Sequence, residues 1–111
     1  MDCYEIWADL APGATDLEFS DAVAAFLGHL QSRGEIESWT LRRRKFGFGP
    51  EGLGEFNVSI RCRDLEQLDR AFHHAATRAP EIEAIHREVF RRVTNFRSAL
   101  YRDFPDAERE R

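Results

Sequence analysis

The stretch WTLRRRKFGFGPEGLGEFNVSIR, residues 39–61, decides the fold. It joins two runs of strand-forming residues through a loop that contains four glycines and Pro50. Glycine enters positive φ freely and Pro50 has no N–H to give to a strand ladder, so the loop predicts a turn. We therefore expect an antiparallel hairpin in the middle of the chain, whose second strand buries Phe56, Val58 and Ile60 on one face.

The part of the chain before the hairpin predicts a strand followed by a helix. Residues 4–10 alternate, with Tyr4, Ile6, Ala8 and Leu10 on one face and Glu5, Trp7 and Asp9 on the other. Thr15 and Glu18 then have the spacing of a capping box, which predicts a helix over residues 16–33 that ends before Gly34. The first hairpin strand is expected over about residues 36–46, where the alternation is less regular.

The part after the hairpin predicts two helices and a last strand. Asp64 and Gln67 cap a second helix, and Pro80 begins a third. Residues 95–103 predict a fourth strand, although a continued third helix is the alternative. In that strand, Phe96, Ser98 and Leu100 face inward, and Arg97, Ala99 and Tyr101 face outward.

The order β-α-β-β-α-α-β predicts an α+β, ferredoxin-like domain over residues 1–104, with a charged tail over residues 105–111. We expect a four-stranded antiparallel sheet with its helices on one face. Those helices should cover the row of Tyr4, Ile6, Ala8, Phe56, Val58, Ile60, Phe96 and Leu100. We also expect the first and third strands to be adjacent and parallel, which would hold Cys3 and Cys62 far apart as free thiols.

Composition excludes several classes of protein. A net charge of −4 argues against a nucleic-acid-binding protein, and no apolar run approaches the length of a membrane helix. Residues 47–52 match G-x-G-x-x-G, but a strand follows them where a dinucleotide site needs a helix. Residues 45–49 are similar to a ribonucleoprotein motif, yet their aromatic rings lie at the end of the second strand rather than on the third. We expect a cytoplasmic protein with no nucleic-acid or membrane partner.

No metal or cofactor site is expected from the sequence. The four histidines lie on predicted helices, and none has a second ligand at helical spacing. His86 flanks an apolar stripe and is expected to be a half-buried, hydrogen-bonded imidazole rather than a general base. The two cysteines lack a Cys-x-x-Cys spacing.

The uncovered face of the predicted sheet combines charged and aromatic side chains. Guanidinium groups beside Trp7 and Tyr101 suit an anionic or carbonyl-bearing, partly aromatic ligand. Structural ion pairs, such as Asp9 with Arg61, in a dimer seam explain the same composition equally well. The candidate ligand-binding residues are Trp7, Asp9, Thr40, Arg42, Asn57, Ser59, Arg61, Arg97 and Tyr101, and Glu5 shares their face.

Four segments also resemble a known group: residues 4–7, 42–50, 63–72 and 99–105. They resemble short uncharacterised bacterial proteins that are similar to the dimeric α+β-barrel superfamily of stress-responsive and antibiotic-biosynthesis monooxygenase-type domains. The resemblance implies a ferredoxin-like fold and a dimeric barrel. It carries no known active site, so no catalytic residue can be assigned from it.

We therefore expect a homodimer in which two sheets face each other, because an amphipathic open face and edge strands both need cover. Phe46, Phe48 and Leu53 in the hairpin loop are expected to add contacts. The barrel interior is expected to bind or transform a small anionic or aromatic metabolite. A non-catalytic dimeric structural or interaction module is the alternative, and whether the protein is an enzyme stays open.

Overall fold

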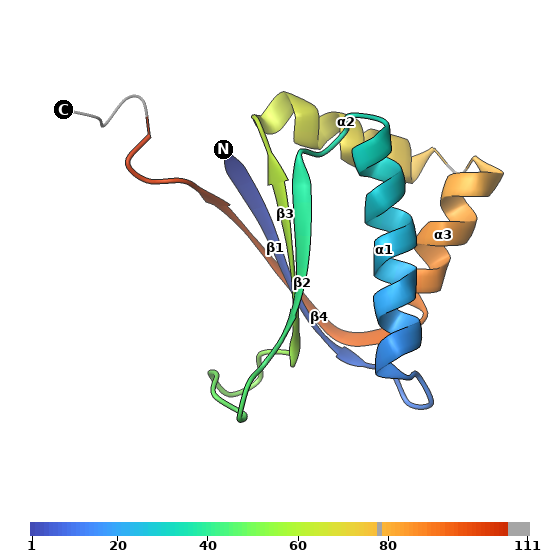
Figure 1. Ribbon diagram of the computed structural model, residues 1–111, viewed down its shortest axis with the longest axis vertical. Helices are drawn as coiled ribbons and strands as arrows, with labels where there is room; N and C mark the ends of the chain where they lie inside the picture. Colours follow the sequence, from blue (N-terminus) through green and yellow to red (C-terminus); the bar gives the residue numbers. More distant parts are fainter. Residues whose placement is uncertain (78, 107–111) are drawn as a thin grey trace.

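The computed structural model describes residues 1–77 and 79–106 of the chain. A four-stranded antiparallel sheet, in the order β2-β3-β1-β4, carries its helices on one face (Figure 1). Residues 107–111, most of the predicted tail, lie outside the described residues. The elements are β1 (Asp2–Leu10), α1 (Asp16–Ser32), β2 (Ser38–Arg43), β3 (Phe56–Cys62), α2 (Leu65–Ala76), α3 (Pro80–Phe90) and β4 (Val93–Arg102).

The helices begin where the capping residues predict. The Thr15 hydroxyl accepts the N–H of Glu18 at the start of α1, and the Asp64 carboxylate accepts the N–H of Gln67 at 2.9 Å at the start of α2. Pro80 occupies the first turn of α3, where its missing N–H has no helical partner to lose. The predicted α1 boundary differs from the observed one by one residue.

The hairpin of β2 and β3 is confirmed, but β2 is shorter than residues 36–46. The N–H of Arg44 still donates to the carbonyl of Glu55 at 2.8 Å beyond the strand end. Phe46 then adopts φ 56°, in the left-handed region, and Gly47 follows with φ 71°. Two successive residues in the left-handed region turn the chain away from the strand direction at this point.

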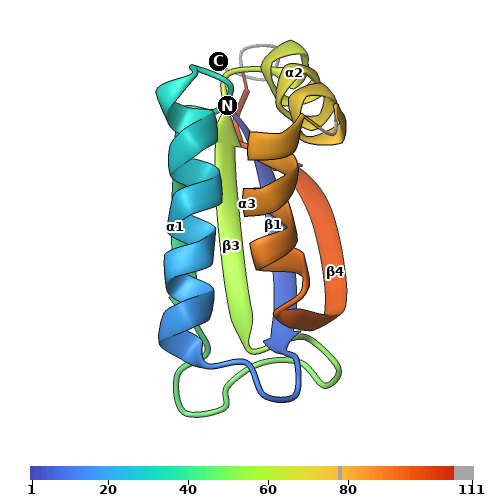
Figure 2. The same ribbon diagram turned by 90° about the vertical axis from the view of Figure 1, so that its right-hand side faces the viewer.

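The last segment is a strand, not a continued helix, and it begins two residues earlier than predicted. Trp7 of β1 pairs with Arg97 of β4, whereas Asp9 pairs with Thr94. Asn95, with φ 53°, is the extra residue of this β-bulge. Phe96 and Leu100 face the helices as predicted, yet they are 43% and 53% exposed because α1 and α3 leave β4 to one side (Figure 2).

The predicted parallel pairing of β1 and β3 is wrong. The strands are antiparallel, and Cys3 is opposite Arg61 while Asp2 is opposite Cys62. The physical reason is the hairpin, which reverses the chain between β2 and β3. Both thiols therefore lie at the same end of the sheet, and both are free. Because side chains alternate along a strand, Cys62 faces the helices and Cys3 faces the opposite side.

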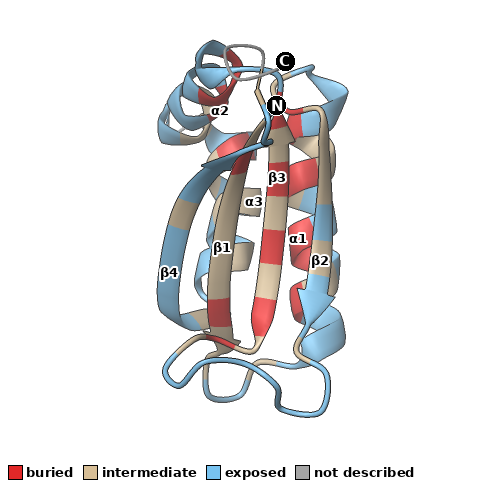
Figure 3. Ribbon diagram, turned by 90° about the vertical axis from the view of Figure 1, so that its left-hand side faces the viewer, coloured by how far each residue is buried: buried red, intermediate tan, exposed pale blue. Residues whose placement is uncertain are grey.

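The hydrophobic core lies between the sheet and the helices. Phe19, Val23, Ile36 and Ile82 are almost fully buried there. Within residues 1–77 and 79–106, no helix or strand covers the opposite face of the sheet, which Figure 3 shows with the strands in the order β4, β1, β3, β2. Among the described residues, no helix is long and apolar enough to cross a membrane.

Candidate functional site

Two hollows lie on opposite sides of the sheet. The inner cavity, between sheet and helices, has a volume of about 120 Å³. The outer hollow, on the uncovered face, has a volume of about 410 Å³. Their chemistry differs, because one is lined by the partly filled core and the other by the polar face that the sequence predicted.

The inner cavity is apolar. An apolar protein cavity of about 150 Å³ takes up benzene, so the inner cavity has room for about one ring. Every helix and three strands contribute to its wall. Its lining includes Tyr4, Ile6, Ala8, Phe19, Val23, Phe26, Leu27, Leu30, Phe56, Val58, Ile60, Phe72, Ala75, His86, Val89, Phe90 and Phe96.

His86 and Tyr4 are the two lining residues whose side chains carry polar atoms. The imidazole of His86 packs between Phe26, at a centroid distance of 5.2 Å, and Phe90, at 4.3 Å. Burial lowers the pKa of His86, which favours the neutral ring. A neutral imidazole both donates and accepts a hydrogen bond, so it can bind a hydroxyl or carbonyl group of a ligand. The predicted hydrogen bond of His86 is not found among the described residues.

The inner cavity opens beside β4. Three of its aromatic lining residues, Phe72, Phe90 and Phe96, are 49%, 42% and 43% exposed. They come from α2, α3 and β4, and the rings of Phe90 and Phe96 lie 5.7 Å apart. Exposed apolar side chains that continue into a cavity are typical of a ligand entrance.

The outer face is organised in rows that run across the strands. Pairing places Arg42, Asn57, Trp7 and Arg97 in one row. A second row, four positions along β1, brings Tyr101 beside Cys3 and Arg61. Four residues of extended chain separate these rows by roughly 13 Å. The three arginines of the predicted cluster therefore lie in two rows, with Arg42 and Arg97 in the row of Trp7 and Arg61 in the row of Tyr101.

Several charges on the outer face are already paired. Glu5 accepts hydrogen bonds from Ser59 and from Asn57. The predicted ion pair of Asp9 with Arg61 is wrong, since antiparallel pairing puts them at opposite ends of the sheet. Asp9 instead accepts hydrogen bonds from the N–H of Glu55 and from the side-chain amide of Asn95. Arg61 donates to the carboxylate of Asp103 at 2.6 Å.

The Cys3 thiol lies within this ionic cluster. Arg61 Nη1 is 3.1 Å from its sulfur, and an oxygen of Asp103 is 3.9 Å away. Burial raises the pKa of Cys3, and Arg61 opposes that shift only in part. A thiol with a raised pKa is a poor nucleophile at neutral pH. The arrangement therefore does not activate the Cys3 thiol as a nucleophile.

Arg42 and Arg97 differ from Arg61. Neither forms an ion pair with a carboxylate within residues 1–77 and 79–106, and both are exposed. They flank Asn57 and Trp7 in their row. These two guanidinium groups are available to an anion or to a partner chain.

The outer hollow brings together six of the nine predicted ligand-binding residues. The six are Trp7, Thr40, Arg42, Ser59, Arg61 and Tyr101. The other three, Asp9, Asn57 and Arg97, do not line it. Sequence reasoning missed the inner cavity altogether, and it missed five residues that line the outer hollow: Cys3, Ser38, Trp39, Arg102 and Asp103. The apolar helical stripes that line the cavity look the same in a sequence as a filled core.

Comparisons with known proteins identify a family and a fold. The family model described as "Family of unknown function (DUF6614)" matches residues 1–111. A comparison with curated proteins found no match.

Solved structures give the fold. The crystal structure of At3g17210 from Arabidopsis thaliana is similar with a TM-score of 0.75 at 6% identity, covering 96% of this chain and 99% of that one. A dimeric ferredoxin-like protein of unknown function from Thermobifida fusca has a TM-score of 0.62 at 11% identity, with 90% and 88% covered. SnoaB, a cofactor-independent oxygenase from Streptomyces nogalater, has a TM-score of 0.64 at 12% identity, with 95% of each chain covered. The predicted ferredoxin-like α+β fold is confirmed.

Proposed function

Since the chain belongs to the family of unknown function DUF6614, no activity comes with the family, and we propose that each subunit of a homodimer binds a small aromatic ligand in the inner cavity. The observation that carries the proposal is an apolar cavity of about 120 Å³ whose lining includes the imidazole of His86, a group whose pKa is lowered by burial. One ring fits the apolar part, and a hydroxyl or carbonyl substituent reaches His86. Larger ligands extend through the entrance at Phe72 and Phe96.

The imidazole of His86 also defines the chemistry that the cavity would support. SnoaB, which shares the fold, is an oxygenase that needs no cofactor. A substrate with its own reactivity suits a cavity that offers little besides apolar walls and a base. If the ligand is transformed, His86 is the side chain suited to take a proton from it.

Filling the cavity tests the proposal. Ala75 lines the cavity, whereas its neighbour Ala76 is exposed on the same helix. We expect phenol to raise the melting temperature of the wild type and of Ala76→Phe. The melting temperature of Ala75→Phe should stay the same with and without phenol. Circular dichroism checks that Ala75→Phe is folded, because overpacking costs about 1–3 kcal/mol. An equal response in all three proteins would contradict the proposal.

A second pair of ligands tests the role of His86. The wild type should bind phenol more tightly than toluene, which has the same ring but no hydroxyl. His86→Leu should lose this preference, because the apolar side chain offers no hydrogen bond. A preference that survives in His86→Leu would show that another group recognises the hydroxyl.

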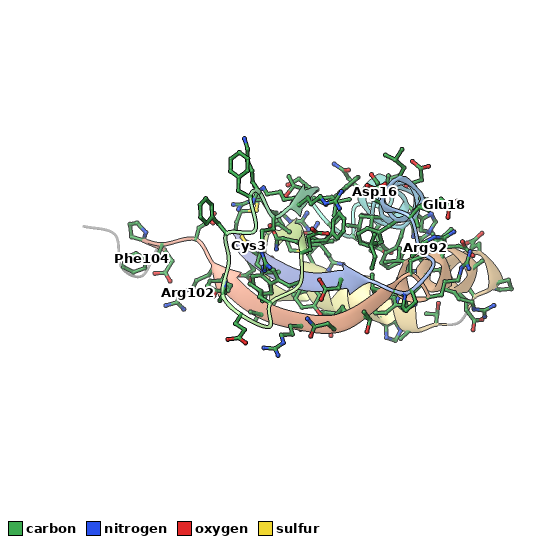
Figure 4. All side chains as sticks on the ribbon, turned by 90° about the horizontal axis from the view of Figure 1, so that it is seen from below. Cys3, Asp16, Glu18, Arg92, Arg102 and Phe104 are labelled. Carbon is green, nitrogen blue, oxygen red and sulfur yellow. The ribbon has the colours of Figure 1, made fainter. Side chains whose placement is uncertain are left out.

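The homodimer is proposed to form through the outer face. That face is uncovered, and the Cα radius of gyration of 14.8 Å exceeds the roughly 13 Å expected for a compact domain of this size. Part of the excess is the C-terminal extension, where Arg102 and Phe104 lie far from the helices (Figure 4). Phe104, Phe46 and Phe48 are 74%, 82% and 81% exposed. Such side chains are typical of contacts with a second copy.

Light scattering after gel filtration tests the dimer. We expect twice the 12.9 kDa mass of the chain at micromolar concentration. The double substitution Phe46→Ser and Phe48→Ser should shift the protein toward the monomer, because it removes two apolar rings that the second copy would cover. A wild-type protein that elutes as a monomer would contradict this part of the proposal and leave the inner cavity unaffected.

A second function is proposed for the outer hollow, which would become the barrel interior when two copies meet. Arg42, which has no carboxylate partner among the described residues, lines this hollow together with Trp7 and suits an anionic aromatic ligand. Benzoate should quench Trp7 fluorescence in a Trp39→Phe background, and Arg42→Gln should weaken that response. Quenching that is the same in Arg42→Gln leaves the outer face as a seam between subunits, the non-catalytic alternative.

A further inference from the structure

Two histidines that are 45 positions apart in the chain meet between α1 and α2. His29 lies in the last turn of α1 and His74 in the last turn of α2. Their Nε2 atoms are 3.3 Å apart, and the ring centroids are 5.5 Å apart with planes inclined by 22°. Because the nitrogens are much closer than the centroids, the rings meet edge to edge and do not stack face to face.

The distance between the two nitrogens matches that of two ligands on one metal ion. Zinc binds histidine nitrogen at about 2.0–2.1 Å, and two ligands of a tetrahedral ion are then roughly 3.3–3.4 Å apart. The nitrogens now point toward each other, as in an N–H···N hydrogen bond. To bind one ion, both side chains would have to rotate until their lone pairs point to a common position.

The surrounding field also favours a cation. Both histidines lie at helix C-termini, where the helix dipoles place partial negative charge. Both side chains are only partly buried, so an ion and its water ligands have access from solvent. In the part of the chain that the structure describes, no group of three or more potential ligands gathers, so a metal here would have two protein ligands and otherwise water.

We propose that His29 and His74 form a binding site for one divalent transition-metal ion, of the class that prefers imidazole, and that the ion holds α1 and α2 together. Zinc, nickel and copper belong to this class, whereas magnesium and calcium prefer oxygen ligands. The site is independent of the inner cavity, so its failure would leave the proposed function standing.

The test uses the untagged full-length protein with zinc chloride as the probe. Calorimetry should give one zinc ion per chain, and the melting temperature should rise with zinc, return with EDTA and stay constant with magnesium. His29→Gln and His74→Gln should each weaken zinc binding at least tenfold. His73→Gln is the matched control, since it removes a neighbouring, exposed histidine of the same helix.

A spectroscopic measurement covers the case in which a variant fails to fold. In the wild-type protein, zinc should shift the imidazole ring signals of His29 and His74 and leave those of His73 and His86 in place. Absence of zinc binding, or equal loss of binding in His73→Gln, would overturn the proposal. Zinc that perturbs all four histidines alike would also overturn it, because it would indicate nonspecific binding.

Discussion

Gln67 gives the sharpest test of how the fold is held together. Its side chain is fully buried, at 0% exposure, although it is polar. Its Oε1 accepts the N–H of Arg63 at 2.7 Å, and its Nε2 donates to the carbonyl of Gly34 at 3.0 Å. It therefore ties the start of α2 to the turn that follows α1. We expect Gln67→Met, which keeps a similar shape without polar atoms, to destabilise the protein strongly.

The magnitude follows from these two bonds. Each contributes about 1 kcal/mol net, and a buried group left without a partner costs roughly 1–3 kcal/mol. Arg63 and Gly34 are exposed, so water replaces part of what is lost. The free energy of unfolding should fall by about 2–3 kcal/mol. With an unfolding entropy of about 2.1 cal/mol/K per residue, the melting temperature of a chain of this length should fall by roughly 9–13 °C.

Urea unfolding followed by circular dichroism measures this change at a fixed protein concentration, because a dimer's stability depends on concentration. Gln31→Met is the matched control. It makes the same chemical change at an exposed position, where the side chain donates one bond to Glu37 at 3.2 Å, and it should cost less than about 0.5 kcal/mol. Equal losses in both variants would refute the claim that burial makes Gln67 important.

Three further predictions concern single positions. Gly54→Ala should lower the melting temperature sharply, because an added Cβ would lie 2.5 Å from the backbone of Ala8; a change within error would show that β1 can yield. Hydrogen bonds to Asp9 lower its pKa, so its stabilisation is present above the ordinary value of 3.8 and is lost as pH falls through the folded-state pKa. The stability difference between the wild type and Asp9→Asn should therefore shrink in acid, and a constant difference would contradict this. Burial raises the pKa of Cys62 to about 11, so it should resist alkylation at pH 8 in the native protein, while unreduced denatured protein titrates as two thiols; a count of zero would contradict the opposite-face placement.

The proposed sites depend on which side of one sheet a residue faces. Along β1, Tyr4 and Ile6 line the inner cavity, and Glu5 and Trp7 between them line the outer hollow. Neighbouring positions thus serve two different environments. Variants of adjacent residues can separate the two proposed functions. Binding in the inner cavity and binding in the outer hollow can therefore be tested independently.

The sequence by itself determined which residues share a face and where the helices begin. Alternation puts Phe56, Val58, Ile60 and Cys62 on one side of β3, and the caps at Thr15 and Asp64 act within four residues of their partners. Such signals are local, because strand period and capping couple a residue only to its near neighbours in the chain. They are therefore readable without knowing the fold.

Only the tertiary structure decided which distant residues meet. The direction of β3 relative to β1 moved Arg61 away from Asp9 and placed it beside Cys3 and Asp103. The positions of the helices decided that the apolar stripes leave a cavity around His86 and that His29 reaches His74. These contacts arise from strand pairing and helix packing over long separations, and periodicity along the chain carries no information about either.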